Sequence, residues 1–389
     1  MKIAIVTDEF PPASRGGSGV VAWREAKALV KRGHEVRVFT PGTPGNQTIE
    51  GIDVCFLGSS DFKKRSSWQA IFDHELLDQL KKPMADYGPD VVHCHHLISF
   101  FGLKTAEWCV EHYKTVATVH DANWVVPDKV WVNDNGQYEP NFFQAFFRHH
   151  LQYNPFLSVL AGRLFRRLST VIFVSDVIRN YYEDVFGKQV NFKTLHNALE
   201  LDEWPQEPLT SDGIIRIGFA SRLTSAKGGG VFVSLIEELN NLGLPAIGSF
   251  IGPEDRFQQA MSAMADHLKP KFEYAGFLKS DEELRQWYKQ ISASFVGSLY
   301  LDPFPNVTLE SLACGRGVIV GPYTGSREIV DTEVGYLLSA GDLADMSLVA
   351  KTLAYIKPFA TWSQNCLEKR DGLGMDDHIQ KLTQIYQGL

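Results

Sequence analysis

The 389-residue sequence has few cysteines, no long apolar run and no excess of positive charge. Its five cysteines are odd in number and form no CxxC pair, which suits a reducing compartment rather than a disulfide scaffold. No apolar stretch approaches the roughly 18 residues of a membrane span, and acidic residues close the short apolar start, which argues against a signal peptide. With a net charge of −8, we expect no nucleic acid as partner. These absences indicate a cytoplasmic protein, and they leave a peripheral place on the inner face of the cell membrane open.

The composition is that of an ordinary globular protein. Hydrophobic residues make up 44% and charged residues 22% of the chain, which excludes a disordered, collagen-like or coiled-coil protein. At roughly 150 residues per domain, the length predicts about two to three domains, each large enough to fold without a disulfide or a metal.

Short apolar runs alternate with longer amphipathic stretches, which predicts a parallel α/β architecture. We expect strands at residues 3–7, 36–40, 91–93, 116–119 and 171–174, and again at 214–220, 246–251, 272–274, 294–297 and 318–321. We expect helices at residues 20–32, 68–87, 100–112, 177–186, 231–241 and 376–387. A polar, proline-rich stretch at 201–213 interrupts the alternation, so the sequence predicts two doubly wound domains joined by a linker.

A glycine-rich loop follows the first expected strand of each half. Gly16 and Gly17 precede a helix, where backbone amides favour a phosphate, although a flexible turn explains the same residues. The spacing is not GxGxxG, and Thr40 stands where a dinucleotide-binding strand ends in an acid, which argues against a dehydrogenase. In the second half, Arg222 and Lys227 lie five residues apart ahead of three glycines and could clamp a diphosphate without a metal; a solvated loop is the alternative.

Residues 302–315 combine two acids with the start of a helix. Two prolines impose an extended approach, Asn306 is a favourable N-cap, and Val307 begins a helix whose free amides point toward an anion. Asp302 and Glu310 flank that anion site. Because carboxylates bind hydroxyl groups better than phosphates, the pair suggests a ribose and a hexose. The alternative is an acid in a loop and a second acid on a helix.

Four histidines, His93, His95, His96 and His120, lie near the ends of two expected strands. Strand alternation puts His93 and His95 on one face, which makes a zinc site conceivable. No cysteine or carboxylate completes a metal-ligand spacing around them, so we expect histidines that line a cleft and no metal site.

Together these motifs resemble the retaining glycosyltransferases of family four, which have the GT-B fold. The resemblance covers nearly the whole chain and is most specific at residues 302–315. The stretches that carry it are Asp8-Glu9-Phe10-Pro11-Pro12, Gly16-Gly17, residues 90–95, His120-Asp121, Asn197, residues 218–227, Tyr274-Ala275-Gly276-Phe277, residues 302–315 and Ser326-Arg327-Glu328-Ile329-Val330.

The resemblance implies two Rossmann-like domains that face each other across a cleft, with a C-terminal helix that returns to the first domain. We expect an acceptor-side domain at residues 1–203, a nucleotide-sugar domain at 204–360 and a C-terminal helical segment at 361–389.

The resemblance also implies roles for individual residues. The catalytic residues would be His120, facing the transferred sugar, Arg222 and Lys227, holding the diphosphate, and Asp302, binding sugar hydroxyls. The substrate-binding residues would be Gly16, Gly17, Asn306, Val307, Thr308, Glu310, Phe277 and Leu278. Among these, the amides of residues 306–308 would meet sugar or phosphate, Glu310 would bind the ribose, and Phe277 and Leu278 would bound the base.

One departure from the family pattern lies at Asp302, where the family has a glutamate that seven residues separate from the second glutamate, here Glu310. The shorter side chain implies a deeper sugar, a different set of hydroxyls or a weaker contact. The resemblance nevertheless implies retaining transfer of a hexose from a nucleoside-diphosphate sugar, UDP-sugar favoured, to a glycan or lipid-linked acceptor, with no metal and no cofactor. The alternatives are a nucleotide-sugar epimerase or hydrolase of the same fold, and a degenerate, non-catalytic assembly subunit.

A segment of the first half also has a pattern typical of membrane surfaces. Residues 142–147 place Phe142, Phe143, Phe146 and Phe147 on one helical stripe, and residues 163–167 place Arg163, Arg166 and Arg167 beside apolar side chains. Aromatic residues beside cations suit an anionic interface. The alternative is that these aromatics are core residues that pack a helix pair onto the sheet.

Overall fold

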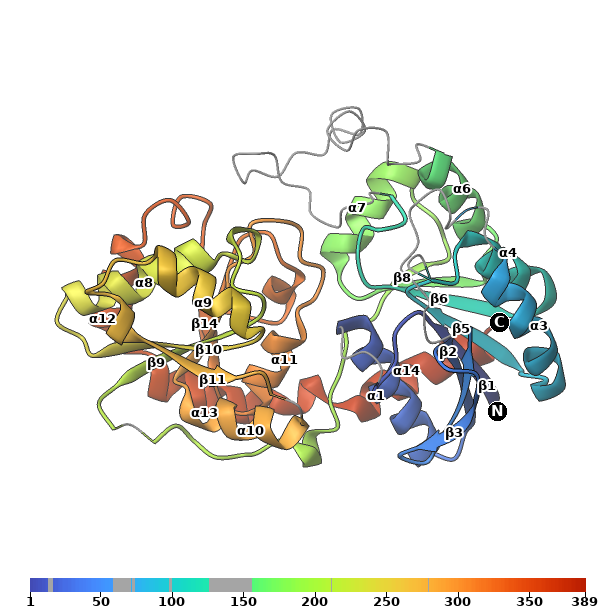
Figure 1. Cartoon of the computed structure of the whole chain (residues 1–389), viewed down its shortest axis with the longest axis horizontal. Coiled ribbons are helices and arrows are strands. Elements are labelled where there is room, and N and C mark those ends of the chain that lie inside the picture. The colour runs from blue at the N-terminus through green and yellow to red at the C-terminus, as the bar shows by residue number, and fades with distance from the viewer. Residues whose placement is uncertain are drawn as a thin grey trace. The chain divides into compact units, whose positions relative to one another are not determined.

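The computed structural model of the chain describes residues 1–12, 17–58, 71, 74–97, 100–125, 156–210, 212–278 and 280–389. These residues form two compact units (Figure 1). Unit 1 holds the described residues up to Asn197 together with Met375–Leu389, and unit 2 holds Ala198–Gly374.

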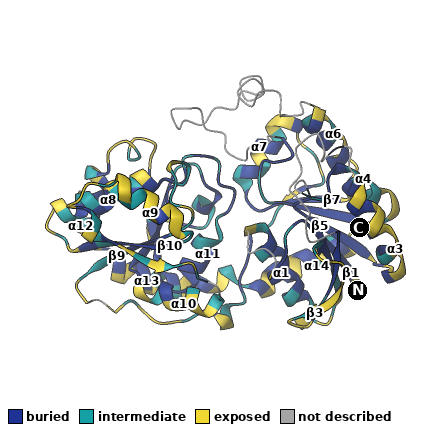
Figure 2. Ribbon diagram, in the orientation of Figure 1, coloured by how far each residue is buried: buried dark blue, intermediate teal, exposed yellow. Residues whose placement is uncertain are grey.

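Unit 1 is built on an eight-stranded sheet with the order β3-β4-β2-β1-β5-β6-β7-β8. Its strands are β1 (Lys2–Thr7), β2 (Glu35–Pro41), β3 (Gly45–Ile49), β4 (Ile52–Leu57), β5 (Val91–His95), β6 (Thr115–Val119), β7 (Thr170–Phe173) and β8 (Phe192–Thr194). All neighbours pair in parallel except β3, which runs antiparallel to β4 at the edge. Apart from Lys2, the central strands β1, β5 and β6 are buried along their length, as expected for a parallel sheet covered by helices (Figure 2).

The described helices of unit 1 are α1 (Gly17–Lys31), α3 (Glu75–Tyr87), α4 (Leu103–His112), α6 (Phe156–Phe165), α7 (Asp176–Phe186) and α14 (Met375–Gln387). Gly33, with a φ of 84°, ends the turn after α1, and Ser175 caps α7 by accepting a hydrogen bond from the Ile178 amide. The C-terminal helix α14 packs against α1 although more than 300 residues separate them, so the last helix completes the first unit (Figure 1).

Unit 2 contains a six-stranded parallel sheet with the order β11-β10-β9-β12-β13-β14. Its strands are β9 (Ile215–Ala220), β10 (Ala246–Ile251), β11 (Phe272–Gly276), β12 (Ala293–Val296), β13 (Gly317–Val320) and β14 (Gly335–Leu337). Its α-helices are α8 (Gly229–Asn241), α9 (Glu254–Ala263), α10 (Asp281–Gln290), α11 (Asn306–Ala313), α12 (Ser347–Ile356) and α13 (Phe359–Lys369). Its 3₁₀ helices are η1 (Leu201–Glu203), η2 (Ser225–Lys227), η3 (Lys269–Lys271), η4 (Gly325–Glu328) and η5 (Arg370–Leu373).

Aromatic side chains from neighbouring strands and from α8 form the core of unit 2. Phe219 on β9, Phe250 on β10 and Phe295 on β12 pack around Phe232 of α8, with ring centroids 5.0–6.4 Å apart. This core holds the strand ends in place, and therefore also the loops that follow them.

The expected α/β architecture with two parallel-sheet domains is confirmed, and the last helix belongs to unit 1. The division into units falls between Asn197 and Ala198, and the chain from 361 to 374 packs with unit 2, so only Met375–Leu389 joins unit 1. In the part of the chain that the structure describes, no helix is both long and apolar enough to cross a membrane.

Candidate active site

The expected donor-site residues gather where the strands of unit 2 end. In a parallel sheet all carboxyl ends lie at one edge, and ligands of open α/β sheets bind outside that edge. Arg222 and Lys227 follow β9, Asp302 follows β12, and Phe277 follows β11. Three different segments of the sequence therefore contribute to one edge.

Lys227 and Asp302 form an ion pair at this edge. The Lys227 ammonium donates to Oδ2 of Asp302 over 2.7 Å, and the Ser298 hydroxyl donates to the same oxygen over 2.7 Å. The Lys227 ammonium also lies 4.8 Å from the centroid of the Tyr300 ring. Burial alone would lower the pKa of Lys227, but the Asp302 carboxylate outweighs it and raises the pKa above the ordinary lysine value, so Lys227 is cationic.

Backbone packing brings the two partners together. The Leu299 amide donates to the Ala226 carbonyl over 2.8 Å, which fastens the loop after β12 to the loop after β9. At Gly228, where φ is 80°, a Cβ atom would stand 2.1 Å from the Gly297 carbonyl oxygen. Glycine at 228 is thus required by close approach of the two loops, which explains part of the glycine-rich stretch.

Asp302 is held on its backbone as well as by its side chain. Its amide donates to the Tyr323 carbonyl over 2.9 Å, and its carbonyl accepts from the Gly325 amide over 3.0 Å. The residue is 8% exposed. Its carboxylate therefore has a fixed position, and the missing methylene cannot be regained by a shift of the loop.

Helix α11 starts one residue earlier than its sequence suggests. Pro305 is the N-cap residue, without a side-chain cap, and Asn306 is the first helical residue, so the prediction that Asn306 is the N-cap is wrong. Proline fits because its fixed φ suits the approach to a helix. The Thr308 amide turns back to the Pro305 carbonyl over 3.0 Å, and the Thr308 hydroxyl lies 2.5 Å from the Ser326 hydroxyl.

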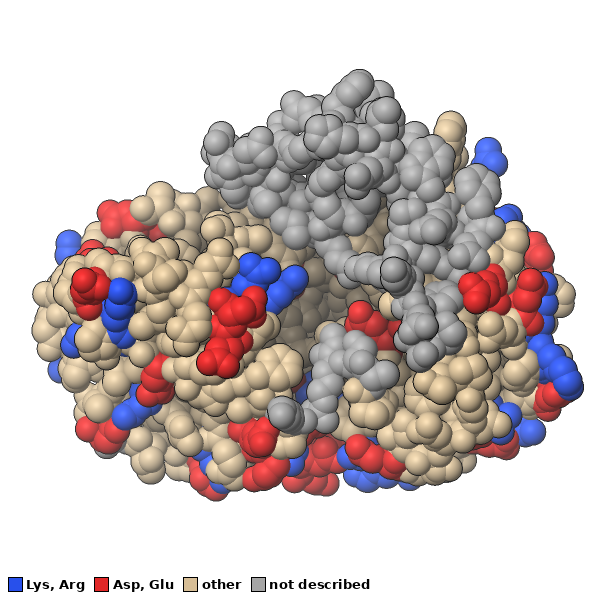
Figure 3. All heavy atoms as spheres, in the orientation of Figure 1, with Lys and Arg blue, Asp and Glu red and all other residues tan. Residues whose placement is uncertain are grey.

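Glu310 lies on α11 and is 6% exposed. The Tyr288 hydroxyl of α10 donates to its Oε2 over 3.0 Å. Unlike the buried Glu310, Phe277 is 59% exposed, and Arg222 is exposed as well. An exposed phenylalanine after β11 is available to a flat partner, whereas Glu310 is partly committed to the tyrosine. On the face of the molecule in Figure 3, the coloured side chains of opposite sign are interspersed.

His120 follows β6 in unit 1 and stacks on His95. The His120 Nε2 atom lies 3.0 Å from Nδ1 of His95, and the ring centroids are 5.2 Å apart. Burial, with His95 as the next cause, lowers the pKa of His120 to about 3, so the imidazole is neutral near pH 7. Asp121 follows in a tight turn in which its Oδ1 accepts from the Asn123 amide over 2.9 Å.

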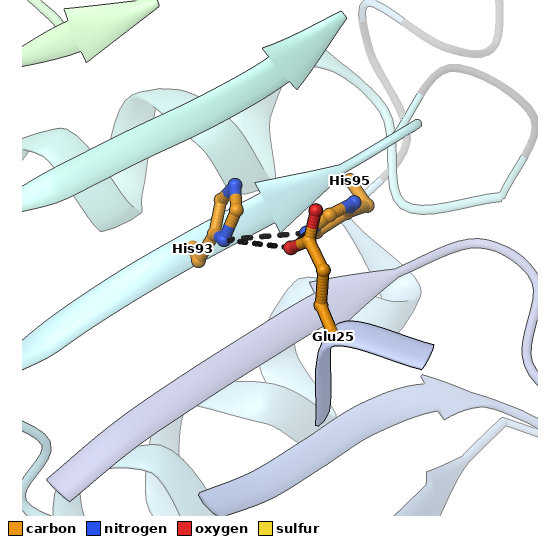
Figure 4. Close-up of side chains that lie close together, drawn as sticks. All are labelled: Glu25, His93 and His95. Carbon is orange, nitrogen blue, oxygen red and sulfur yellow. Dashed lines mark hydrogen bonds and ion pairs between the residues drawn. The ribbon is translucent and has the colours of Figure 1, made fainter. Parts of the chain in front are cut away.

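Behind His120 lies a buried polar cluster that the sequence did not predict (Figure 4). Glu25 of α1 points at His93 and His95 of β5, and all three side chains are at most 3% exposed. No carboxylate has metal-ligand spacing to these histidines along the sequence, but Glu25, which is distant in sequence, reaches them through the packing of α1 on β5. The histidines are also buried rather than at a solvent-lined edge.

The sequence models of known families match both halves of the chain. That of Glycosyltransferase Family 4 matches residues 15–203, and that of Glycosyl transferases group 1 matches residues 215–356. The chain belongs to the family four glycosyltransferases. It is therefore an enzyme, as the motifs predict.

Individual relatives of the transferase are distant. A glycosyltransferase of Methanocaldococcus jannaschii is 26% identical over 356 residues, which are 86% of this chain and 84% of the relative. The sucrose-phosphate synthase of Thermosynechococcus elongatus has a TM-score of 0.77 at 17% identity, over 100% of this chain and 98% of that one. The Anabaena protein HepE, solved in complex with UDP and glucose, has a TM-score of 0.72 at 17% identity, over 100% of both chains. At such identities the structural likeness shows the fold.

The glycine loop of the transferase's first half is only partly described. Gly16 lies outside the described residues, whereas Gly17 is the exposed first residue of α1. Two residues on, a Cβ atom at Gly19 would come within 2.9 Å of the Glu9 carbonyl oxygen, so glycine is needed there for close packing.

The expected membrane segment of the transferase is also described only in part. Residues 142–147, with their four phenylalanines, lie outside the described residues. In and just after α6, the apolar neighbours of the arginines, Leu164, Phe165 and Leu168, are buried in the core. The side chains of Arg163, Arg166 and Arg167 are exposed, and Arg167 pairs with Glu111 over 3.1 Å. These apolar side chains are therefore unavailable to lipid.

Proposed function

We propose that the transferase moves a hexose from a nucleoside-diphosphate sugar, UDP-sugar favoured, to a glycan or lipid-linked acceptor, with retained anomeric configuration and without a metal ion. The observation that carries this proposal is the ion pair of Lys227 and Asp302 at the carboxyl edge of the second sheet. Asp302 lies four residues before Asn306, the first residue of α11. A cation, a carboxylate and a helix N-terminus suit the two chemical parts of a nucleotide sugar, phosphate and hydroxyls.

The leaving diphosphate defines the task of the cations. As the bond between the anomeric carbon and the diphosphate oxygen breaks, negative charge grows on that oxygen. Lys227 and Arg222 would stabilise this charge, with the Val307 amide in the first turn of α11 as a further donor. The raised pKa of Lys227 supports this role, because the ammonium keeps its charge throughout the working pH range.

The carboxylates would bind the neutral parts of the donor. Asp302 would accept hydrogen bonds from hexose hydroxyls. Lys227 and Ser298 both donate to one of its oxygens and so hold the carboxylate in place. Glu310 would bind the ribose, with Tyr288 holding its side chain in place. Exposed Phe277 would border the base. That HepE was solved with UDP and glucose supports uridine and a hexose for this fold.

Retention would follow from attack on the face that the leaving group departs from. The leaving oxygen would take the proton of the acceptor hydroxyl, so no general base is required. The neutral state of His120 suits a hydrogen-bonding role toward the sugar rather than that of a cation.

Thermal unfolding with a panel of nucleotides tests the donor. A ligand at 100 times its Kd stabilises the folded state by about 2.7 kcal/mol, which raises Tm by a few degrees for a chain of this size. UDP should raise Tm more than the other nucleoside diphosphates do, and the rise should persist in excess EDTA. A rise that requires Mg²⁺ would contradict metal-free binding.

Mutation tests the chemistry. Arg222→Ala and Lys227→Ala should each lower kcat by about 10²–10³, because a preorganised charge at the leaving group is lost. The matched controls Arg256→Ala and Lys351→Ala, both at exposed helical positions, should keep the wild-type kcat. Wild-type turnover in both test variants would end the assignment to the diphosphate.

The product separates the proposal from its rivals. NMR of the sugar released by slow hydrolysis of an α-linked donor should show the α-anomer first, as retention demands. A β-anomer as the first product would contradict retention, a changed sugar stereocentre in the recovered donor would indicate an epimerase, and an intact donor after long incubation would indicate a non-catalytic subunit.

A further inference from the structure

The strongest unexplained feature of the molecule is the buried cluster around Glu25 in unit 1 (Figure 4). It joins three elements: α1, β5 and the C-terminal helix α14. Nε2 of His95 lies 3.3 Å from Oε2 of Glu25 and 3.3 Å from Nδ1 of His93, and Nδ1 of His93 lies 3.7 Å from Oε2 of Glu25. Three electron-pair donors thus converge on one point.

We propose that Glu25, His93 and His95 bind a divalent transition-metal ion of the zinc class. Zinc bound tetrahedrally at 2.0–2.1 Å separates its ligand atoms by about 3.3 Å, and two of the three separations here have that value. Two imidazoles with one carboxylate form a ligand set that zinc commonly takes. All three side chains are at most 3% exposed.

The carboxylate gives an independent sign of a missing cation. Oε2 of Glu25 is buried, and among the described residues no hydrogen bond reaches it, although Nε2 of His95 lies 3.3 Å away. An ionised carboxylate oxygen without a partner in the interior is costly, whereas one that coordinates a cation is satisfied.

The surrounding residues orient the ligands as the second shell of a metal site does. Nε2 of His93 lies 2.7 Å from the Thr118 hydroxyl, and Nδ1 of His95 lies 3.0 Å from Nε2 of His120. Both partners are able to accept a hydrogen bond, so each imidazole can carry its proton on the far nitrogen and present a lone pair to the ion. The second carboxylate oxygen of Glu25 accepts from His378 over 3.1 Å.

Tyr386 competes with the ion in the metal-free protein. Its hydroxyl lies 2.7 Å from Nδ1 of His93, the nitrogen that would bind the metal. Metal binding must displace this hydrogen bond or take the phenol oxygen as a further ligand. The ion would be structural, since its ligands are inaccessible to substrate, and it would leave the proposed chemistry at Lys227 unchanged. Its link to the reaction would run through His95 to the orientation of His120.

Metal content measured on the intact protein tests this site. Because the site is buried, the protein is produced in zinc-supplemented cells so that loading accompanies folding, and then freed of loose metal by gel filtration. We expect about one zinc per chain. Glu25→Gln, which keeps the shape of the side chain, and His93→Gln should lower bound zinc at least tenfold. His267→Gln, at an exposed histidine, should keep it.

Two further variants keep the test decisive if either ligand variant fails to fold. Thr118→Val should lower zinc affinity by about 10–100-fold, as loss of a second-shell partner does. Tyr386→Phe should retain its zinc, because only the competing hydroxyl is lost. A strong chelator should lower the Tm of the wild type but not that of Glu25→Gln. Wild-type protein with less than about one-tenth equivalent of zinc, or equal zinc in Glu25→Gln, would overturn the proposal and leave a metal-free hydrogen-bonded network.

Discussion

The ion pair of Lys227 and Asp302 makes a quantitative prediction about stability. We consider Lys227→Met, which keeps the length of the side chain, Asp302→Asn, which keeps its shape, and the double variant. The two side chains are 21% and 11% exposed, so the pair is screened much less than a surface pair. The double variant should therefore lose less unfolding free energy than the two single variants lose in sum.

The magnitude follows from the geometry. Two unit charges 2.7 Å apart attract each other by about 6 kcal/mol at an effective dielectric constant of about 20. The loss of hydration of both ions offsets most of this, so we expect a coupling free energy of about 2 kcal/mol. Lys227→Met should cost more than Asp302→Asn. Among the described residues it leaves the carboxylate with Ser298 alone as a side-chain donor, whereas the lone lysine keeps its contact with the Tyr300 ring.

Urea unfolding of all four proteins, followed by fluorescence, measures the coupling. Turnover measured on the same proteins should behave differently: it should fall in both single variants and stay low in the double variant, because the diphosphate and the sugar each lose a partner. Lys82 and Asp86, an exposed pair on α3, provide the matched control cycle, with an expected coupling below about 0.5 kcal/mol. Additive stability effects at 227 and 302, within 0.5 kcal/mol, would refute the reasoning.

Three further predictions concern the rest of the molecule. Arg316→Lys should lower the unfolding free energy by about 3 kcal/mol in urea, because its guanidinium is 2% exposed and donates to five backbone carbonyls; a loss below 1 kcal/mol, or an equal loss in Arg256→Lys, would contradict this. Burial raises the pKa of Cys314 and of Cys366 to about 12, so stability should fall between pH 9 and 12, because thiols ionise in the unfolded chain and not in the folded one. If the unfolding free energy of Cys366→Ala falls as steeply with pH, that thiol is excluded as a cause. Co-sedimentation with anionic vesicles at low salt should weaken when the three arginines of residues 163–167 become Gln, and no binding by the wild type would remove the membrane hypothesis.

Much of the fold is predictable because buried parallel strands read as short apolar runs. The strand expected at residues 246–251 is β10 to the residue, and the helix expected at 376–387 begins only one residue earlier, at Met375. Tertiary contacts decide where other helices begin. The helix expected from residue 100 begins at Leu103, after Gly102 with a φ of 78°, and the Phe101 amide donates to Asp8, which follows the neighbouring strand β1. That hydrogen bond joins residues 93 positions apart, which no local pattern reveals.

Elements without a strong pattern escape prediction. The edge strand β3 is polar and almost wholly exposed, so its residues show no alternation. The strands β8 and β14 are three residues long, too short for a periodic signal. Helix α10 is highly polar and buries only Trp287 and Tyr288, and its clearest mark is a capping box between Ser280 and Glu283.

The two halves of the candidate site differ in the same way. The donor residues of unit 2 sit in loops directly after strands, where the topology of a parallel sheet already brings them to one edge, so motif and position agree. Glu25 carries no such signal. It stands on the buried face of an amphipathic helix, among Ala22, Ala26 and Leu29, where an acid looks like an exception to the apolar stripe. An acid at a core-facing helical position requires a partner in the neighbouring layer. In a parallel α/β unit that layer is the sheet, and His93 and His95 are polar side chains on one of its strands, β5. The pairing of these two exceptions could therefore have been inferred from the sequence, whereas their 3.3 Å spacing, on which the metal hypothesis depends, required the packing of α1 on β5.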